Sequence, residues 1–191
     1  MSQILYIEKI PAGERAIFSA GLVGIARLLN VSNLNWLMQV MYAESKVNPK
    51  AYNATSGASG LIQFMPATAK GLGTTTQLLL RMTATQQLEY VYKYFRPYRG
   101  RLNSYFDVYM VVFFPVAIGK PENWVFQTAR LSPEIIAKQN PAINIIKDGK
   151  ITISEFKQYL QKTVPKIYQN IIFPVAAGGA ALLLFSALFF F

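Results

Sequence analysis

The residue with the clearest chemical potential in this chain is Glu44, a carboxylate at the end of a long uncharged stretch. Residues 33–43 carry no charge and are mostly apolar, so a helix over them would be largely buried. Burial disfavours the ionised form of a carboxyl group, and the negative end of a helix dipole acts in the same direction. Both effects raise the pKa of Glu44, as a general acid working near neutral pH requires.

The composition removes several alternative chemistries. The 191 residues include no histidine and no cysteine, which excludes a Ser-His-Asp triad, thiolate or imidazole metal sites and disulfides. Between residues 33 and 130 the acids are Glu44, Glu89, Asp107 and Glu122. This scarcity favours a mechanism that uses one carboxylate, and no metal or cofactor is expected.

The residues after Glu44 follow a specific pattern. Glu44 and Ser45 are followed by Asn48-Pro49, by Asn53, by Ser-Gly-Ala-Ser-Gly-Leu-Ile-Gln-Phe-Met-Pro at 56–66 and by Thr-Ala at 68–69. The stretch 36–69 closely resembles the catalytic core of soluble lytic transglycosylases and goose-type lysozymes. It departs from that pattern at Ile62, where the family has Met, and at Asn53, where many relatives have Ser.

The resemblance implies a mainly α, lysozyme-like catalytic domain that cleaves the β-1,4 bond between N-acetylmuramic acid and N-acetylglucosamine in peptidoglycan. It makes Glu44 the catalytic residue, acting first as acid and then as base while a 1,6-anhydromuramic product closes. It also implies substrate contacts for a further set of residues, Ser45, Asn53, Ser59, Gly60, Leu61 and Gln63. Glycines in this loop would let a glycan approach the backbone closely.

A third departure concerns a tyrosine that hydrogen-bonds the catalytic glutamate in the family. The matching position here is Phe113 or Phe114, which has no hydroxyl. Tyr109, one helical turn earlier than Phe113, shares its helix face. Tyr109 and Phe113 are therefore both candidate substrate-site residues. Whether Tyr109 reaches Glu44 or is an ordinary core tyrosine stays open at this point.

Two other functions remain as alternatives. A hydrolytic lysozyme of the inverting type would need a second carboxylate roughly 6.5–9.5 Å from the first, and Asp107 or Glu89 would have to supply it. The other alternative is a catalytically inactive, wall-binding structural protein of a virion. It is supported by the phenylalanine at the position where the family has tyrosine.

The net charge of +10 fits several anionic partners. The basic residues are spread along the chain, the tightest group being Arg96, Arg99 and Arg101, and no nucleic-acid motif accompanies them. A solvated basic face is therefore expected, and nucleic acid is not expected as a partner.

Residues 171–191 contain no charged side chain. As a helix with a rise of about 1.5 Å per residue they would match the thickness of a bilayer core, and three lysines precede them, Lys157, Lys162 and Lys166. We therefore expect three parts: a lysozyme-like transglycosylase domain at 1–130, a small helical extension at 131–166 and a single-pass C-terminal transmembrane anchor at 167–191. The N-terminus is not typical of a signal peptide.

This combination predicts a membrane protein whose partners are peptidoglycan glycan strands and lipid. A virion membrane of a membrane-containing bacteriophage, with other virion membrane proteins as further partners, is the favoured location. A tail-anchored enzyme of the bacterial cell envelope is the alternative.

Apolar spacing and breaker residues predict the helices, which are expected at 13–29, 33–45, 61–70, 83–95, 104–114, 121–126 and 133–138, with a last helix from about 154 that runs past Pro165 into the anchor. Residues 144–155 are spaced like an EF-hand calcium loop with Asp148 and Glu155 at acidic positions. Two anionic ligands are too few for good calcium affinity, so this loop is interpreted as a structural turn.

Overall fold

The computed structural model describes residues 3–174, and these are almost entirely helical. The α-helices are α1 (Arg15–Leu29), α2 (Asn35–Ser45), α3 (Pro66–Gly71), α4 (Thr76–Leu79), α5 (Ala84–Phe95), α6 (Tyr105–Phe113), α7 (Pro133–Gln139), α8 (Ile153–Thr163) and α9 (Gln169–Ile172). Short 3-10 turns lie at Ile7–Lys9, Ala12–Glu14, Arg96–Tyr98, Pro115–Ala117 and Lys166–Tyr168. Extended pairing within residues 3–174 is limited to isolated bridges. The prediction of a mainly α protein is confirmed.

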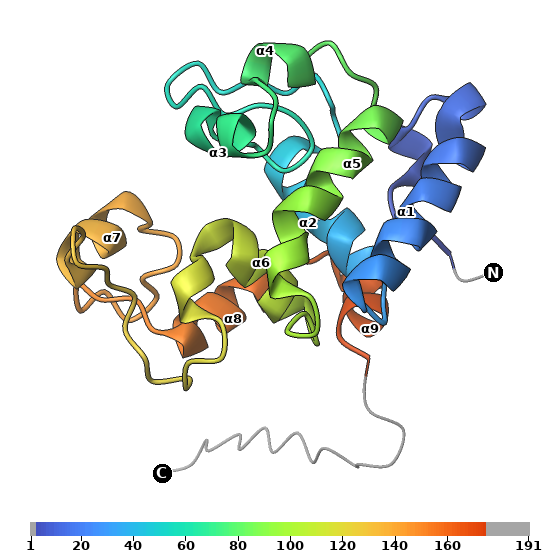
Figure 1. Ribbon diagram of the computed structural model, residues 1–191. Helices are drawn as coiled ribbons and strands as arrows, with labels where there is room; N and C mark the ends of the chain where they lie inside the picture. The colour runs from blue at the N-terminus through green and yellow to red at the C-terminus, as the bar shows by residue number, and fades with distance from the viewer. Residues whose placement is uncertain (1–2, 175–191) are drawn as a thin grey trace.

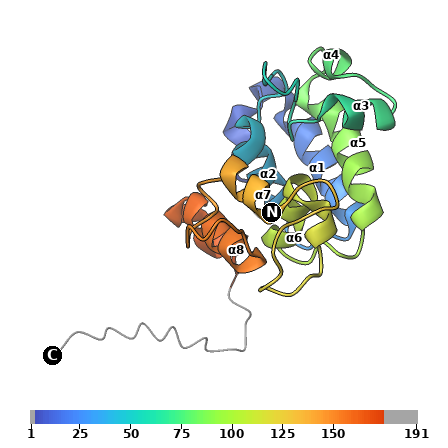
Figure 2. The same ribbon diagram turned by 90° about the vertical axis from the view of Figure 1, so that its left-hand side faces the viewer.

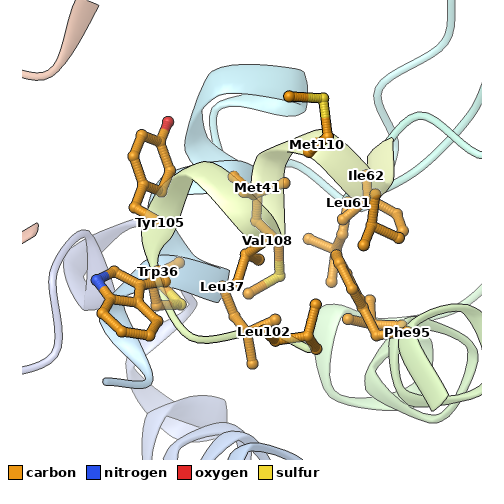
Figure 3. Close-up of a cluster of buried hydrophobic side chains, with 14 of the residues drawn as sticks. Trp36, Leu37, Met41, Leu61, Ile62, Phe95, Leu102, Tyr105, Val108 and Met110 are labelled. Carbon is orange, nitrogen blue, oxygen red and sulfur yellow. The ribbon is translucent and has the colours of Figure 1, made fainter. Parts of the chain in front are cut away.

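The core is built around α2, whose residues Asn35–Met41 are all buried. α2 packs against α6, and α1 packs against α5 (Figure 1). Figure 3 shows Leu37 and Met41 of α2 meeting Val108 of α6, with Leu61 of the loop nearby. A helix that is apolar on all sides is stable only inside such a cluster, and this placement fixes the end of α2 and with it Glu44.

Three predicted helices differ from the structure. The helix expected at 61–70 begins only at Pro66, because Gly60 and Gln63 hold positive φ angles of 78° and 52° that a right-handed helix excludes. Residues 121–126 form a turn and a bridge at Val125 instead of a helix. The last predicted helix ends at Thr163, before Pro165, because proline disfavours a helical conformation in the residue before it.

The extension at 131–166 contributes α7 and α8, and α8 packs against α6 through aromatic rings. Phe156 of α8 stacks on Phe113 of α6, with ring centroids 4.8 Å apart. Phe126 meets Phe113 edge to face at 5.5 Å. Figure 2 shows α7 and α8 on the viewer's side of the molecule, with α1 behind α2. The extension therefore shares a core with the helix that carries Tyr109.

The loop at 144–155 uses its second acid to hold the start of α8. Glu155 is 2% exposed. Its carboxylate accepts hydrogen bonds from the backbone N–H of Ile146 at 3.0 Å and from the N–H and hydroxyl of Thr152 at 2.9 and 3.1 Å. The N–H of Glu155 in turn donates to the Thr152 hydroxyl at 3.2 Å, and this reciprocal pair is a capping box. Such a role fits the interpretation as a structural turn.

The segment assigned to the membrane anchor divides in two. Residues 175–191 lie outside the described residues, whereas 167–174 pack on the folded domain. Ile172 is 1% exposed, and its carbonyl accepts a hydrogen bond of 2.8 Å from Trp36 Nε1. Phe173 stacks on Phe106 with ring centroids 5.1 Å apart. Within residues 3–174, none of the helices has the length and apolar composition that crossing a bilayer requires.

Candidate active site

Glu44 lies in the last turn of α2, half-buried, and has a polar partner on α6. The hydroxyl of Tyr109 donates a hydrogen bond of 2.8 Å to Glu44 Oε1. The two residues are 65 positions apart in sequence, so the bond depends on the packing of α2 against α6. The sequence left two interpretations of Tyr109 open. In the structure its hydroxyl reaches Glu44.

Burial governs the ionisation of this pair. Removal from water raises the pKa of Glu44, and the hydrogen bond from Tyr109 opposes part of that shift because it stabilises the anion. Burial and the neighbouring carboxylate raise the pKa of Tyr109. The tyrosine therefore stays protonated as a donor while the glutamic acid retains its proton at higher pH than an exposed one does.

Ser45, the neighbour of Glu44, is buried and serves the fold. Its hydroxyl lies 2.9 Å both from the carbonyl oxygen of Met41 and from that of Leu61. It thus connects the end of α2 to the loop that follows. The chain then turns sharply, and Val47 adopts a φ of 58°, a rare conformation for a β-branched residue. Contact between Ser45 and a substrate stays a prediction.

The loop residues Ser59, Gly60 and Leu61 have their backbone groups engaged within the protein. Ser59 exchanges two backbone hydrogen bonds with Phe64, of 3.1 and 2.8 Å. The N–H of Gly60 donates to the carbonyl of Ala51 at 2.8 Å. In the structure these groups stabilise the loop itself, and their contact with a glycan remains a prediction.

Gln87 of α5 is the functional-site neighbour that the sequence did not reveal. It is fully buried. Its Oε1 accepts from the N–H of Leu61 at 2.8 Å, and its Nε2 donates to the carbonyls of Pro49 at 2.7 Å and Leu79 at 2.8 Å. Gln87 therefore holds both ends of the loop that follows Glu44. A signal was present, because Gln87 lies on the helix face that also carries Ala84, Leu88 and Val91.

The glycine at position 60 is required by Gln87. A β-carbon at Gly60 would lie 2.5 Å from Gln87 Oε1, and the backbone there has a φ of 78°. Both the left-handed conformation and the close approach of the amide therefore favour glycine. The sequence interpretation assigned this freedom to an approaching sugar, whereas in the structure the approaching group is a side chain of the same protein.

Asn53 and Gln63 lie at the two ends of the loop surface. Asn53 is exposed, and its Oδ1 accepts from the backbone N–H groups of Thr55 and Ser56 at 3.0 and 3.1 Å. Gln63 is half-buried, and its Nε2 donates to the carbonyl of Gly60 at 3.1 Å. Both side chains thus shape the loop.

Phe113 faces the extension. Its ring is enclosed by Phe114, Phe126 and Phe156, so it belongs to the interface between α6 and α8. Tyr109 also touches Phe156, with ring centroids 5.9 Å apart. The two candidates on α6 therefore differ: Tyr109 contacts Glu44, and Phe113 helps to seat the extension beside it.

The other acids of the segment 33–130 have partners of their own. Asp107 accepts from the hydroxyl of Ser104 at 2.8 Å at the start of α6. Glu89 pairs with Lys93 at 2.6 Å, and Glu122 pairs with Lys157 at 2.8 Å. Among residues 3–174 no group of three or more acids could hold a metal ion.

Comparison with known families gives a match over part of the chain. Residues 23–106 match the family model described as the transglycosylase SLT domain, which confirms the resemblance seen in the sequence. The matched segment contains Glu44 and Gln87 and ends three residues before Tyr109. Neither a curated protein nor a solved structure gave a match. The match supports a function on peptidoglycan.

Proposed function

We propose that this protein is a peptidoglycan lytic transglycosylase in which Glu44 is the sole catalytic carboxylate. The observation that carries the proposal is the hydrogen bond between Glu44 and Tyr109. Glu44 lies inside the segment that matches a transglycosylase family, and Tyr109 lies three residues after its end. A half-buried glutamic acid with a raised pKa can donate a proton near neutral pH.

The reaction needs one carboxyl group in two states. Glu44 first donates its proton to the glycosidic oxygen as the bond from that oxygen to C1 of the muramic acid breaks. The resulting carboxylate then removes the proton of the muramyl 6-hydroxyl, whose oxygen attacks C1 and closes the 1,6-anhydro ring. No water is consumed, and Glu44 regains its proton. The hydrogen bond from Tyr109 stabilises the carboxylate between the two steps.

The partners of the other acids argue against a hydrolytic lysozyme. Asp107 accepts hydrogen bonds at the start of α6 and Glu89 forms an exposed ion pair with Lys93, so both carboxylates already have other partners. An inactive wall-binding protein is also disfavoured, because Tyr109 supplies the hydroxyl that Phe113 lacks.

The segment 171–191 supports the membrane part of the proposal. Its last seventeen residues, 175–191, are uncharged and rich in Leu, Ala and Phe. We propose that they hold the enzyme in a membrane. Delivery to the wall by a membrane-containing bacteriophage is the favoured setting, and a bacterial tail-anchored enzyme is the alternative.

The chemistry is tested by digesting purified murein sacculi and weighing the products. A transglycosylase releases disaccharide peptides with 1,6-anhydromuramic ends, and a hydrolase releases products that are heavier by one water. Mainly reducing muramic ends would assign the protein to the lysozymes, and unchanged sacculi with retained binding would assign it to the inactive wall-binding class. Flotation of the full chain with lipid vesicles tests the anchor separately.

A further inference from the structure

The outer face of α1 is an apolar surface that no other element of residues 3–174 covers. Ile17 is 66% exposed, Leu28 is 54% exposed and Val23 is 41% exposed. Ala20 is exposed on the same side, and a β-carbon at Gly24 would meet open space. Positions 17, 20, 24 and 28 follow the spacing of a single helix face. This surface, named here the α1 face, is formed by Ile17, Ala20, Val23, Gly24 and Leu28.

The charge of α1 indicates which kind of partner fits the α1 face. Arg27 is exposed beside the α1 face, whereas Arg15 donates hydrogen bonds to the carbonyls of Ile10 and Glu8 at 2.9 and 3.1 Å. Apolar residues bordered by arginine are typical of helices that lie in the interface of a bilayer with anionic lipids. The helix spans about 22 Å at 1.5 Å per residue, which gives the α1 face the length for such a contact.

The end of the described chain lies close to the end of α1. Asn33, four residues after Leu29 closes α1, donates a hydrogen bond of 2.6 Å from Nδ2 to the carbonyl of Ile171. Ser32 and Pro174 line the same cavity of about 880 Å³. The described chain therefore ends beside the loop that follows α1. Two exposed lysines, Lys162 and Lys166, precede this end.

We infer that the α1 face rests on the lipid bilayer that residues 175–191 enter. This inference rests on the membrane part of the proposed function and adds an orientation to it. α1 lies on the opposite side of α2 from α3, α7 and α8 (Figures 1 and 2). With the α1 face on lipid, the side of the molecule formed by α3, α7 and α8 points away from the membrane, toward the wall.

The absence of cysteine makes the contact directly measurable. Single cysteines are introduced as Ala20→Cys and Leu28→Cys in the full chain, with Ala67→Cys on α3 as the matched control because Ala67 is exposed on the other side. Each is spin-labelled and reconstituted into vesicles of phosphatidylcholine and phosphatidylglycerol. Flotation is recorded first, and label depth is then measured from accessibility to oxygen and to a water-soluble nickel complex.

The expected result is that labels at 20 and 28 lie about 5–10 Å below the headgroups, as in interfacial helices, while the label at 67 stays in water. Flotation with all three labels in water would overturn the inference and leave the anchor standing. Failure to float would overturn both the inference and the anchor.

Immobilised labels at 20 and 28 that are shielded from lipid would also overturn the inference, because protein would then cover the α1 face. Dilution with excess lipid identifies the covering group. Mobility that returns on dilution assigns the α1 face to a second copy of the chain, and mobility that does not return assigns it to residues 175–191 of the same chain.

Discussion

The hydroxyl of Tyr109 and the carboxyl group of Glu44 form a 2.8 Å hydrogen bond between two helices that are far apart in sequence. Tyr109 lies one helical turn before Phe113 and provides a hydroxyl that Phe113 and Phe114 lack. Glu44 therefore keeps its orientation only while α6 keeps its position on α2.

Removal of the Tyr109 hydroxyl should slow the reaction and shift its pH profile. Tyr109→Phe removes a hydrogen bond to a charged group, worth about 1.5–3 kcal/mol, and should lower kcat by roughly 10- to 100-fold. Because the bond lowers the pKa of Glu44, its loss raises that pKa. The fall of kcat/KM with rising pH should then occur at higher pH than in the parent.

The matched control for this prediction is Tyr94→Phe. The Tyr94 hydroxyl donates to the carbonyl of Val111 at 2.9 Å and not to Glu44, so its loss should leave the pH profile unchanged. Equal pH profiles for the parent and Tyr109→Phe, measured by turbidity of sacculi, would contradict the assigned role of Tyr109.

Glu44→Gln should abolish wall lysis and stabilise the fold. The substitution keeps the shape of the side chain and removes the acid, so activity should fall by about 100-fold or more. The raised folded-state pKa means that the native protein is penalised above the unfolded pKa of glutamate, about 4.3. The penalty is absent below that pH and grows until the folded pKa is passed.

Urea unfolding of the parent and of Glu44→Gln at a series of pH values measures how this penalty changes the free energy of unfolding. At neutral pH the Glu44→Gln variant should be more stable than the parent, because it lacks the carboxyl group whose pKa burial raises. The difference should shrink toward zero below about pH 4. A variant that is less stable than the parent at neutral pH would show that the ionised carboxylate contributes to the fold.

Alanine at position 60 should destabilise the loop through its contact with Gln87. Gly60→Ala places a β-carbon 2.5 Å from Gln87 Oε1, in addition to the left-handed backbone cost of about 1–2 kcal/mol. Gly73→Ala is the control, because Gly73 has a similar φ of 80° with nothing within 4 Å. Gly60→Ala should be clearly the more damaging of the two in thermal unfolding.

A double-mutant cycle identifies the clash. Gln87→Ala alone leaves the N–H of Leu61 and the carbonyl of Pro49 without their partners, at about 1–3 kcal/mol each for buried groups. The carbonyl of Leu79 keeps its bond from the N–H of Met82. Gln87→Ala also removes the atom that Gly60→Ala would strike. The two changes together should cost less than the sum of their separate effects. If the two losses of stability are additive, the Gln87 side chain moves aside at no cost and the proposed clash is wrong.

Glu155 and Asp148 should respond differently to removal of charge. Glu155→Gln replaces one acceptor oxygen with an amide that cannot accept from Ile146 or Thr152, so we expect a loss of about 1–3 kcal/mol. Asp148→Asn should have little effect, since Asp148 is exposed and accepts one local bond from Lys150. Melting temperatures should be the same with and without calcium. A calcium-dependent rise in the parent that Glu155→Gln abolishes would establish a metal site.

Two truncations separate the folded domain from the segment beyond it. A chain ending at Pro174 keeps Ile172 and Phe173 and should remain folded and active. A chain ending at Gln169 loses the carbonyls that pair with Asn33 and Trp36 and the buried Ile172 side chain, and should unfold at lower temperature. Equal melting temperatures by circular dichroism would show that residues 170–174 contribute nothing to stability.

The sequence predicted the parts of the site that depend on local pattern. The uncharged run before Glu44 predicted α2 and its burial, and the one-turn spacing from Phe113 identified Tyr109 as a candidate. Gln87 was missed, because a glutamine on an apolar helix face shows no sign of its three partners until the loop is folded around it.

The sequence also could not show where the folded domain ends. Ile172 and Phe173 are apolar, and the same composition suits a protein core and a bilayer. The bond from Trp36 to the carbonyl of Ile172 and the stacking of Phe173 on Phe106 place them in the domain, and these partners are distant in sequence.

The hydrogen bonds from Asn33 and Trp36 fix the order in which the catalytic helix can be completed. The side chains at the start of α2 pair with the carbonyls of Ile171 and Ile172, which are synthesised after nearly all of the described chain. Contacts of such sequence separation form late in folding. The helix that carries Glu44 therefore reaches its final packing only once residues 171 and 172 have joined the domain.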